Sequence, residues 1–277
     1  MTKLEYTFKT DTLFKMLFVK HPELLKNLVA VLLRIEDDSI GRFEITNPEM
    51  PAESLGDKFC RLDINMTVDG QRVDLEIQVR DEGDYPERVL FHWAREYSTA
   101  LAAGEGYDQL PRTIIISIIN FKLFECAEYH SEFCAIEVTR HTLLTDKMSL
   151  QFFELPKIPL EISAEDHAVL WLSLFRADTE DELTKINALG VPVMNQAIDA
   201  FRSITVSPEF REIERLYAKS RHDEAQALRH ARLEERFETK LEIAKNCLQK
   251  SIPLDTIVEI TGLSPNEVEK MRGSDLS

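Results

Sequence analysis

The sequence predicts an α/β domain followed by an all-helical region, and three patterns support this prediction. Residues 59–79 contain two runs of alternating apolar and polar side chains joined by Asp69-Gly70, which is a strong signal for a β-hairpin. Residues 114–119 are isoleucines around a single serine, which is typical of a strand buried on both faces. From about Ser163 onward the pattern becomes helical with polar connections. We therefore expect a mixed sheet flanked by helices, with an all-α C-terminal region.

The other elements follow from the spacing of apolar residues along the chain. A period of 3.6 residues predicts helices and a period of two predicts strands. We expect helices over residues 11–35 and 84–103, and strands over residues 43–47, 133–140 and 150–155. Two prolines near residues 156–163 suggest a domain boundary, so the expected domains are residues 1–160 and 161–277.

The composition restricts the possible classes of protein. The 277 residues include 33 Lys+Arg and 49 Asp+Glu, a net charge of −16, which argues against a protein that coats DNA without regard to sequence. An enzyme that acts on DNA through a local basic groove and a divalent metal remains compatible. No apolar run approaches the roughly 20 residues of a membrane helix, and the N-terminus has no apolar signal core. We expect a cytoplasmic protein with no membrane partner, whose four scattered cysteines are reduced.

The register of the hairpin follows from its two-residue turn. Val68 would face Gln71, and counting back along both strands places Asp63 directly across from Glu76. Their Cβ atoms would then lie roughly 4.5–5.5 Å apart on the polar face of the hairpin. The apolar face is expected to pack against the helices around residues 13–33 and 90–101.

Two carboxylates opposed across a ladder require an explanation, because like charges in that position are destabilising. One explanation is a solvated face on which the side chains splay apart. The other is a divalent cation that bridges the carboxylates. Mg²⁺ favours one or two protein carboxylates, with water and phosphate oxygens completing its shell. Such a site suits phosphodiester hydrolysis.

At this point the chain resembles a known family. The order of helix, hairpin with Asp…Glu-x-(Lys) and helix is similar to the PD-(D/E)XK nuclease core. More narrowly, it resembles the recombination-promoting nucleases, also described as PD-(D/E)XK family transposases. The matching segments are residues 11–18, Leu62-Asp63-Ile64, Leu75-Glu76-Ile77-Gln78, Arg88 to Tyr97, and Leu110-Pro111.

The resemblance implies a metal-dependent DNA endonuclease that acts in recombination or transposition, or against foreign DNA. It implies Mg²⁺ as the cofactor, with Mn²⁺ or Ca²⁺ as substitutes, held by Asp63 and Glu76. Gln78 stands where the family usually has a lysine, and its amide supplies no positive charge. Lys15 could take that role. Asp11, one helical turn earlier, is either a third acid of the site or half of a surface ion pair with Lys15.

The helix after the hairpin carries the candidate substrate-binding residues. Arg88 and Tyr97 are expected to face the phosphate, and Arg88, His92, Trp93 and Arg95 could form a stripe that faces DNA. The alternative is that Trp93 belongs to the core and the arginines are solvated.

The C-terminal region leaves several functions open. Residues 209–250 mix acids and bases at helical spacing, which suggests an exposed helix and a possible homodimer. Residues 252–270 resemble a helix-turn-helix, but the acidic second helix favours packing or self-association over DNA reading. The alternatives to an active nuclease are an inactive nuclease fold that serves as an adaptor, and a DNA-binding regulator dependent on residues 251–277.

Overall fold

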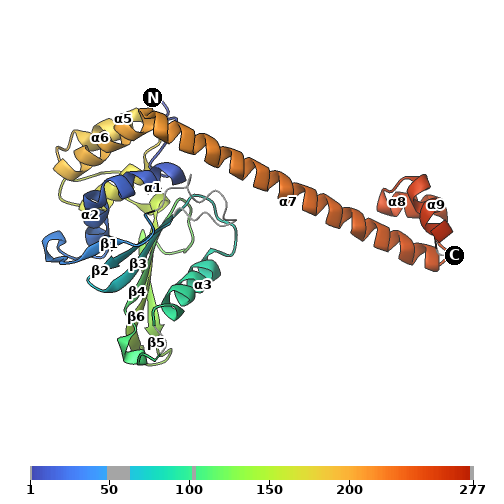
Figure 1. Cartoon of the computed structure of the whole chain (residues 1–277), viewed down its shortest axis with the longest axis horizontal. Coiled ribbons are helices and arrows are strands. Elements are labelled where there is room, and N and C mark those ends of the chain that lie inside the picture. Colours follow the sequence, from blue (N-terminus) through green and yellow to red (C-terminus); the bar gives the residue numbers. More distant parts are fainter. Residues whose placement is uncertain (1, 49–62, 102–103, 275–277) are drawn as a thin grey trace. The chain divides into compact units, whose positions relative to one another are not determined.

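The computed structural model describes residues 2–48, 63–101 and 104–274. In this part of the chain, six strands form one mixed sheet in the order β1-β2-β3-β4-β6-β5 (Figure 1). The strands are β1 (Phe43–Ile45), β2 (Ile64–Val68), β3 (Gln71–Gln78), β4 (Thr113–Ile119), β5 (His130–Ile136) and β6 (Leu143–Glu154). The helices of the N-terminal unit are α1 (Asp11–Lys20), α2 (Pro22–Leu32), α3 (Tyr85–Ser98), α4 (His167–Arg176), α5 (Glu180–Asn187) and α6 (Pro192–Val206).

The hairpin has the predicted register. Val68 pairs with Gln71 and Asn65 pairs with Asp74 in the antiparallel ladder of β2 and β3. Asp69 and Gly70 both have positive φ angles, 47° and 81°, as a tight two-residue hairpin turn requires. The first residues of the predicted strand, 59–62, lie outside the described residues, and β2 begins at Ile64.

The isoleucine-rich segment forms the buried centre of the sheet. Strand β4 is buried at every position and pairs in parallel with β3 on one side and β6 on the other. This confirms the expectation of a strand covered on both faces. The parallel pairing aligns Glu76 of β3 with Ser117 of β4.

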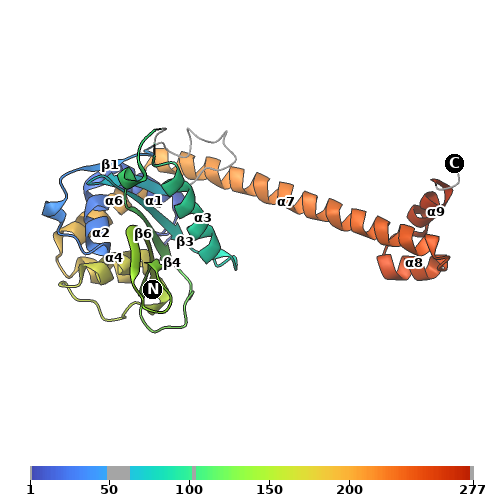
Figure 2. The ribbon, with the colours of Figure 1, turned by 90° about the horizontal axis from the view of Figure 1, so that it is seen from below.

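Helices cover the two faces of the sheet unequally. Helices α1, α2, α4, α5 and α6 pack with the apolar face of the hairpin into one large core, which includes Ile64, Leu75 and Trp171. Helix α3 lies on the opposite face (Figures 1 and 2), over a smaller cluster that includes Tyr85, Val89 and Ile115. The expectation that residues 90–101 pack against the apolar face was therefore wrong. The segment crosses over between the parallel strands β3 and β4 on the face that also bears the polar side chains.

The two compact units of the chain meet at a later residue than the domain boundary expected near residue 160. The compact N-terminal unit extends to Tyr217, because α4, α5, α6 and the start of α7 (Pro208–Gln249) pack into the large core. The second unit, from Ala218, contains the rest of α7 together with α8 (Leu254–Thr261) and α9 (Pro265–Ser274). Its small core includes Ala244, Ile257 and Val268.

Two expectations drawn from composition concern membranes and thiols. No helix in the described ranges is long and apolar enough to cross a bilayer. Cys126, Cys134 and Cys247 carry free thiols, whereas Cys60 lies outside the described residues.

Candidate metal centre

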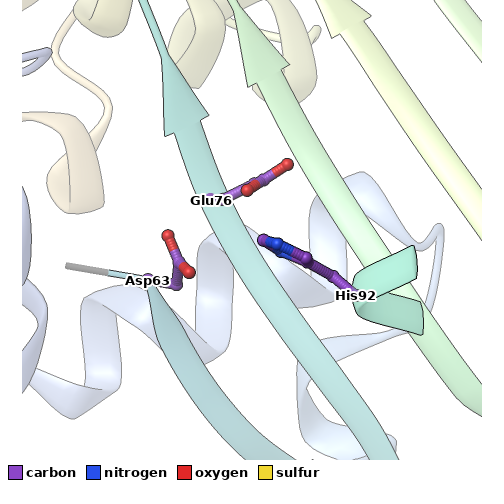
Figure 3. Close-up of side chains that lie close together, drawn as sticks. All are labelled: Asp63, Glu76 and His92. Atoms are coloured by element: carbon purple, nitrogen blue, oxygen red, sulfur yellow. The ribbon is translucent and has the colours of Figure 1, made fainter. Parts of the chain in front are cut away.

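Three side chains converge at the open end of the hairpin. Asp63 directly precedes β2, Glu76 lies in β3, and His92 extends from α3 (Figure 3). One potential ligand atom from each residue lies within 4.8 Å of those of the other two. Glu76 is buried, and Asp63 and His92 are half-buried. The structure thus brings together the two acids that the register predicted and adds an imidazole.

The local sequence explains why these groups meet. Asp63 directly precedes Ile64, which pairs with Leu75, so extending this register by one residue sets Asp63 beside Glu76. On α3, Tyr85, Val89 and His92 are spaced by four and three residues, which places them on one helical face. Tyr85 and Val89 are buried against the sheet, so His92 is turned toward β3 one turn further along.

Two hydroxyl groups hold the carboxylate of Glu76. The Tyr85 hydroxyl and Ser117 Oγ both donate to Glu76 Oε1, the latter at 3.1 Å. Burial raises the pKa of Tyr85 well above its ordinary value of 10.0, and the adjacent charge of Glu76 adds to the shift. Tyr85 therefore remains a neutral donor at physiological pH. Because both hydroxyls bind Oε1, Oε2 is the oxygen of Glu76 better suited to hold a cation.

Lys15 fixes the main chain beside Asp63. This buried lysine of α1 donates through Nζ to the carbonyl oxygens of Asn47, at 2.5 Å, and Asp63, at 3.0 Å. The side chain of Asn47 donates to the same Asp63 carbonyl at 2.9 Å and accepts from the Asn65 amide at 2.8 Å. Asp11 begins α1, is half-buried and does not belong to the cluster of three.

The comparison with known families agrees with this geometry. The model of the PD-(D/E)XK nuclease family transposases matches residues 8–231. The chain belongs to this family. The match confirms the resemblance found in the sequence motifs, and the mixed sheet with flanking helices is the expected PD-(D/E)XK fold. No curated protein and no solved structure gives a significant match.

Gln78 occupies the position at which the PD-(D/E)XK motif usually has its lysine. It lies two residues beyond Glu76 on β3, is half-buried, and donates through Nε2 to the carbonyl oxygen of Arg80 at 2.9 Å. The side-chain amide of Gln78 is thus held by the main chain just beyond the end of β3.

Arg88 and Tyr97 both have partners within the protein. The guanidinium of Arg88 lies 4.9 Å from the centre of the Tyr85 ring and contacts Glu82 at 3.2 Å. Tyr97 stacks on Trp93 at a centroid distance of 4.9 Å. Trp93 is half-buried and donates through Nε1 to the Thr113 carbonyl at 3.0 Å, which favours a packing role for this residue.

A polar cavity of about 240 Å³ lies on the same face of the hairpin. Its lining includes Asn65 and Asp74, each two residues from a carboxylate of the cluster, and Glu96 from the turn of α3 after His92. Arg72 also lines it and donates to the Glu96 carbonyl at 2.9 Å and to Thr99 Oγ1 at 3.2 Å. The cavity offers space for water on this face, although Asp63, Glu76 and His92 do not line it.

The donor set fits a divalent cation. Carboxylates suit Mg²⁺, Ca²⁺ and Mn²⁺, and an imidazole adds a ligand that transition ions favour. Family members typically need such an ion, and the cluster supplies donor atoms close enough to share one. The sequence argument named His92 only as one of four residues that could form a stripe facing DNA. Its spacing from Tyr85 and Val89 was the available signal that it faces the sheet.

Proposed function

We propose that the protein is a divalent-metal-dependent endonuclease that hydrolyses DNA phosphodiester bonds. The observation that carries the proposal is the convergence of Asp63, Glu76 and His92 in a chain of the PD-(D/E)XK nuclease family. Asp63 and Glu76 would hold the ion, for which the family resemblance implies Mg²⁺, with Mn²⁺ or Ca²⁺ as substitutes. The ion would activate water and stabilise developing charge on the phosphate.

The residues of the chain have defined tasks in this proposal. Tyr85 and Ser117 orient the carboxylate of Glu76, and Lys15 fixes the main chain of Asp63. Lys15 or Gln78 orients the attacking water, and Asp11 serves as a further acid of the site. Arg88 and Tyr97 contact the DNA phosphates once substrate displaces the partners they have in the free protein. A positioned set of groups of this kind lowers the entropy cost of the reaction.

The biological context belongs to the same proposal. The family description as transposases supports a role in recombination or transposition, and defence against foreign DNA is the alternative use of the same chemistry. The exposed apolar side chains of α7, Leu233 and Phe237, support a homodimer formed through the C-terminal helices. Paired subunits would allow both strands of a duplex to be cut.

Cleavage of supercoiled and linear DNA tests the activity. The purified full-length protein is incubated with Mg²⁺, with Mn²⁺ or with a chelator, beside Asp63→Ala and the control Glu44→Gln, an exposed strand acid outside the cluster. The proposal expects nicking that needs the metal, is lost in Asp63→Ala and persists in Glu44→Gln. Nicking that survives the chelator or the Asp63 substitution would contradict it.

A second candidate is a nuclease fold without catalysis that acts as an adaptor in DNA transactions. It is favoured by Gln78, whose amide is held by Arg80 and provides no cationic group, and by the net charge of −16. The adaptor predicts no cleavage and no divalent ion at Asp63 and Glu76. A direct measurement of ion binding therefore separates the two candidates.

A further inference from the structure

The candidate centre contains one group that a pure carboxylate site lacks. His92 reaches the two acids from α3 rather than from the sheet, and Figure 3 shows its ring directed toward Asp63 and Glu76. One of its ring nitrogens lies within 4.8 Å of a carboxylate oxygen of each. This is close enough for one cation to contact all three residues.

We propose that His92 is a third protein ligand and that it makes the centre select Mn²⁺ and related transition ions over Mg²⁺. The inference rests on the proposed metal site and specifies its ion. Mg²⁺ is bound through oxygen ligands and retains several waters, so an imidazole contributes little to its affinity. Transition ions accept both imidazole and carboxylate ligands. A third ligand of this type therefore adds affinity for Mn²⁺ that Mg²⁺ does not share.

The packing of α3 supports a fixed ligand rather than an incidental neighbour. On one side of His92, the Tyr85 hydroxyl binds Glu76, the residue whose carboxylate His92 faces. On the other side, Trp93 Nε1 binds the Thr113 carbonyl, and Arg72 of β3 binds the Glu96 carbonyl at 2.9 Å. The helix is thus attached to β3 and β4 before and after His92. A ligand held in this way loses little freedom when an ion binds.

The competing role is electrostatic. A protonated His92 would neutralise part of the charge of the two acids and would leave when a cation arrives. This role predicts that His92 has no bond to the ion and no influence on which ion binds. The choice of ion and the presence of a metal–nitrogen bond therefore distinguish the two roles.

The test measures binding directly and needs no DNA. Full-length protein is titrated with Mn²⁺ by electron paramagnetic resonance, and Mg²⁺ affinity is obtained by competition. The variants are His92→Asn, His92→Gln, Asp63→Asn and the control His141→Asn, which removes an exposed imidazole from the turn between β5 and β6. His141 has a φ of 54°, a conformation that asparagine tolerates, so the control should fold. Circular dichroism verifies the fold of each variant.

The expected result is a change in the ratio of the Mg²⁺ and Mn²⁺ dissociation constants. Loss of one ligand should weaken Mn²⁺ binding by roughly tenfold or more, while Mg²⁺ binding changes much less. The ratio of the Mg²⁺ to the Mn²⁺ dissociation constant should fall in both His92 variants and should keep its wild-type value in His141→Asn. Pulsed resonance of bound Mn²⁺ should show coupling to an imidazole nitrogen in wild type and in His141→Asn, and none in the His92 variants.

The outcomes separate this inference from the proposed function. One outcome contradicts the role of His92 alone: Asp63→Asn abolishes Mn²⁺ binding, wild type shows no nitrogen coupling, and the His92 variants keep the wild-type ratio of dissociation constants. In that case His92 is not a ligand and the carboxylate site stands. If wild type binds neither ion, or binds Mn²⁺ equally well in Asp63→Asn, the metal site itself is wrong. Should one His92 variant fail to fold, the other and the wild-type nitrogen coupling still decide.

Discussion

The two faces of the β2–β3 hairpin contrast sharply although they share the same backbone. One face contributes Ile64, Met66 and Leu75 to the large core, and each of these side chains is at most 2% exposed. The other face carries the acids, with Glu76 only 6% exposed and the Asp63 carboxylate close to it at the start of β2. Burial of apolar side chains stabilises the fold, whereas opposed and buried acids reduce its stability. This contrast is expected if one face supplies stability and the other supplies the proposed metal site.

The largest expected effect is on the polar face. Glu76→Gln should lower the rate of metal-dependent DNA cleavage by about a thousandfold, because a lost metal ligand removes several kcal/mol of charge stabilisation. The free energy of unfolding should change little, because relief of like-charge repulsion offsets the weakening of the two hydroxyl hydrogen bonds to the carboxylate. Single-turnover cleavage and urea unfolding measure the two quantities. Glu44→Gln is the control, and a large loss of stability in Glu76→Gln would break the contrast between the faces.

The apolar face should show the reverse pattern. Leu75→Ala removes a fully buried side chain and should reduce the free energy of unfolding by about 2–5 kcal/mol. Leu90→Ala, on the exposed side of α3 at 47% exposure, should change it by less than about 0.5 kcal/mol. Urea unfolding of both variants tests this. Similar values for the two would show that the hairpin core does not stabilise the fold as argued.

Added Mn²⁺ should stabilise the folded protein only when both Asp63 and Glu76 are present. At an Mn²⁺ concentration about 100 times the dissociation constant, wild type should gain about 2.7 kcal/mol. Asp63→Asn and Glu76→Gln should gain much less in the same buffer. Thermal or urea unfolding with and without Mn²⁺ provides the comparison. An equal gain in Asp63→Asn would place the bound ion elsewhere.

The smallest effect concerns the hydroxyl that supports Glu76. Tyr85 has a pKa raised above its ordinary value of 10.0, so the folded state retains a proton that the unfolded chain releases. Its contribution is complete below pH 10 and declines as pH rises above it. Tyr85→Phe should cost about 1.5–3 kcal/mol at pH 7, the range for a hydrogen bond to a charged group. The variant should also lose stability less steeply than wild type above pH 10, and parallel curves would contradict the assignment.

Local rules were sufficient to predict the hairpin and its acids. The Asp69-Gly70 turn fixes the register, and the register alone places Asp63 beside Glu76. The position of α3 could not be predicted in this way, because it depends on the crossover between β3 and β4 and on contacts such as Tyr85 with Glu76. From the sequence, His92 was therefore only a candidate for a stripe that faces DNA, and its place beside the two acids was not predicted.

The residue at which the N-terminal unit ends also depends on tertiary packing. The sequence shows that α4, α5 and α6 are amphipathic or apolar helices, but not which surface they cover. In the structure they complete the core over the apolar face of the hairpin, so the unit continues to Tyr217. Periodicity identifies a buried face, and only the tertiary structure identifies its partner.

The most direct test of the account is a crystal of the full-length protein soaked in Mn²⁺, with anomalous diffraction recorded near the manganese edge. The account predicts an anomalous peak within about 2.5 Å of carboxylate oxygens of both Asp63 and Glu76. The peak should be absent from crystals of Glu76→Gln soaked in the same solution. No peak at these residues in wild type, or an undiminished peak in the variant, would contradict the claim that the polar face of the hairpin is a metal centre.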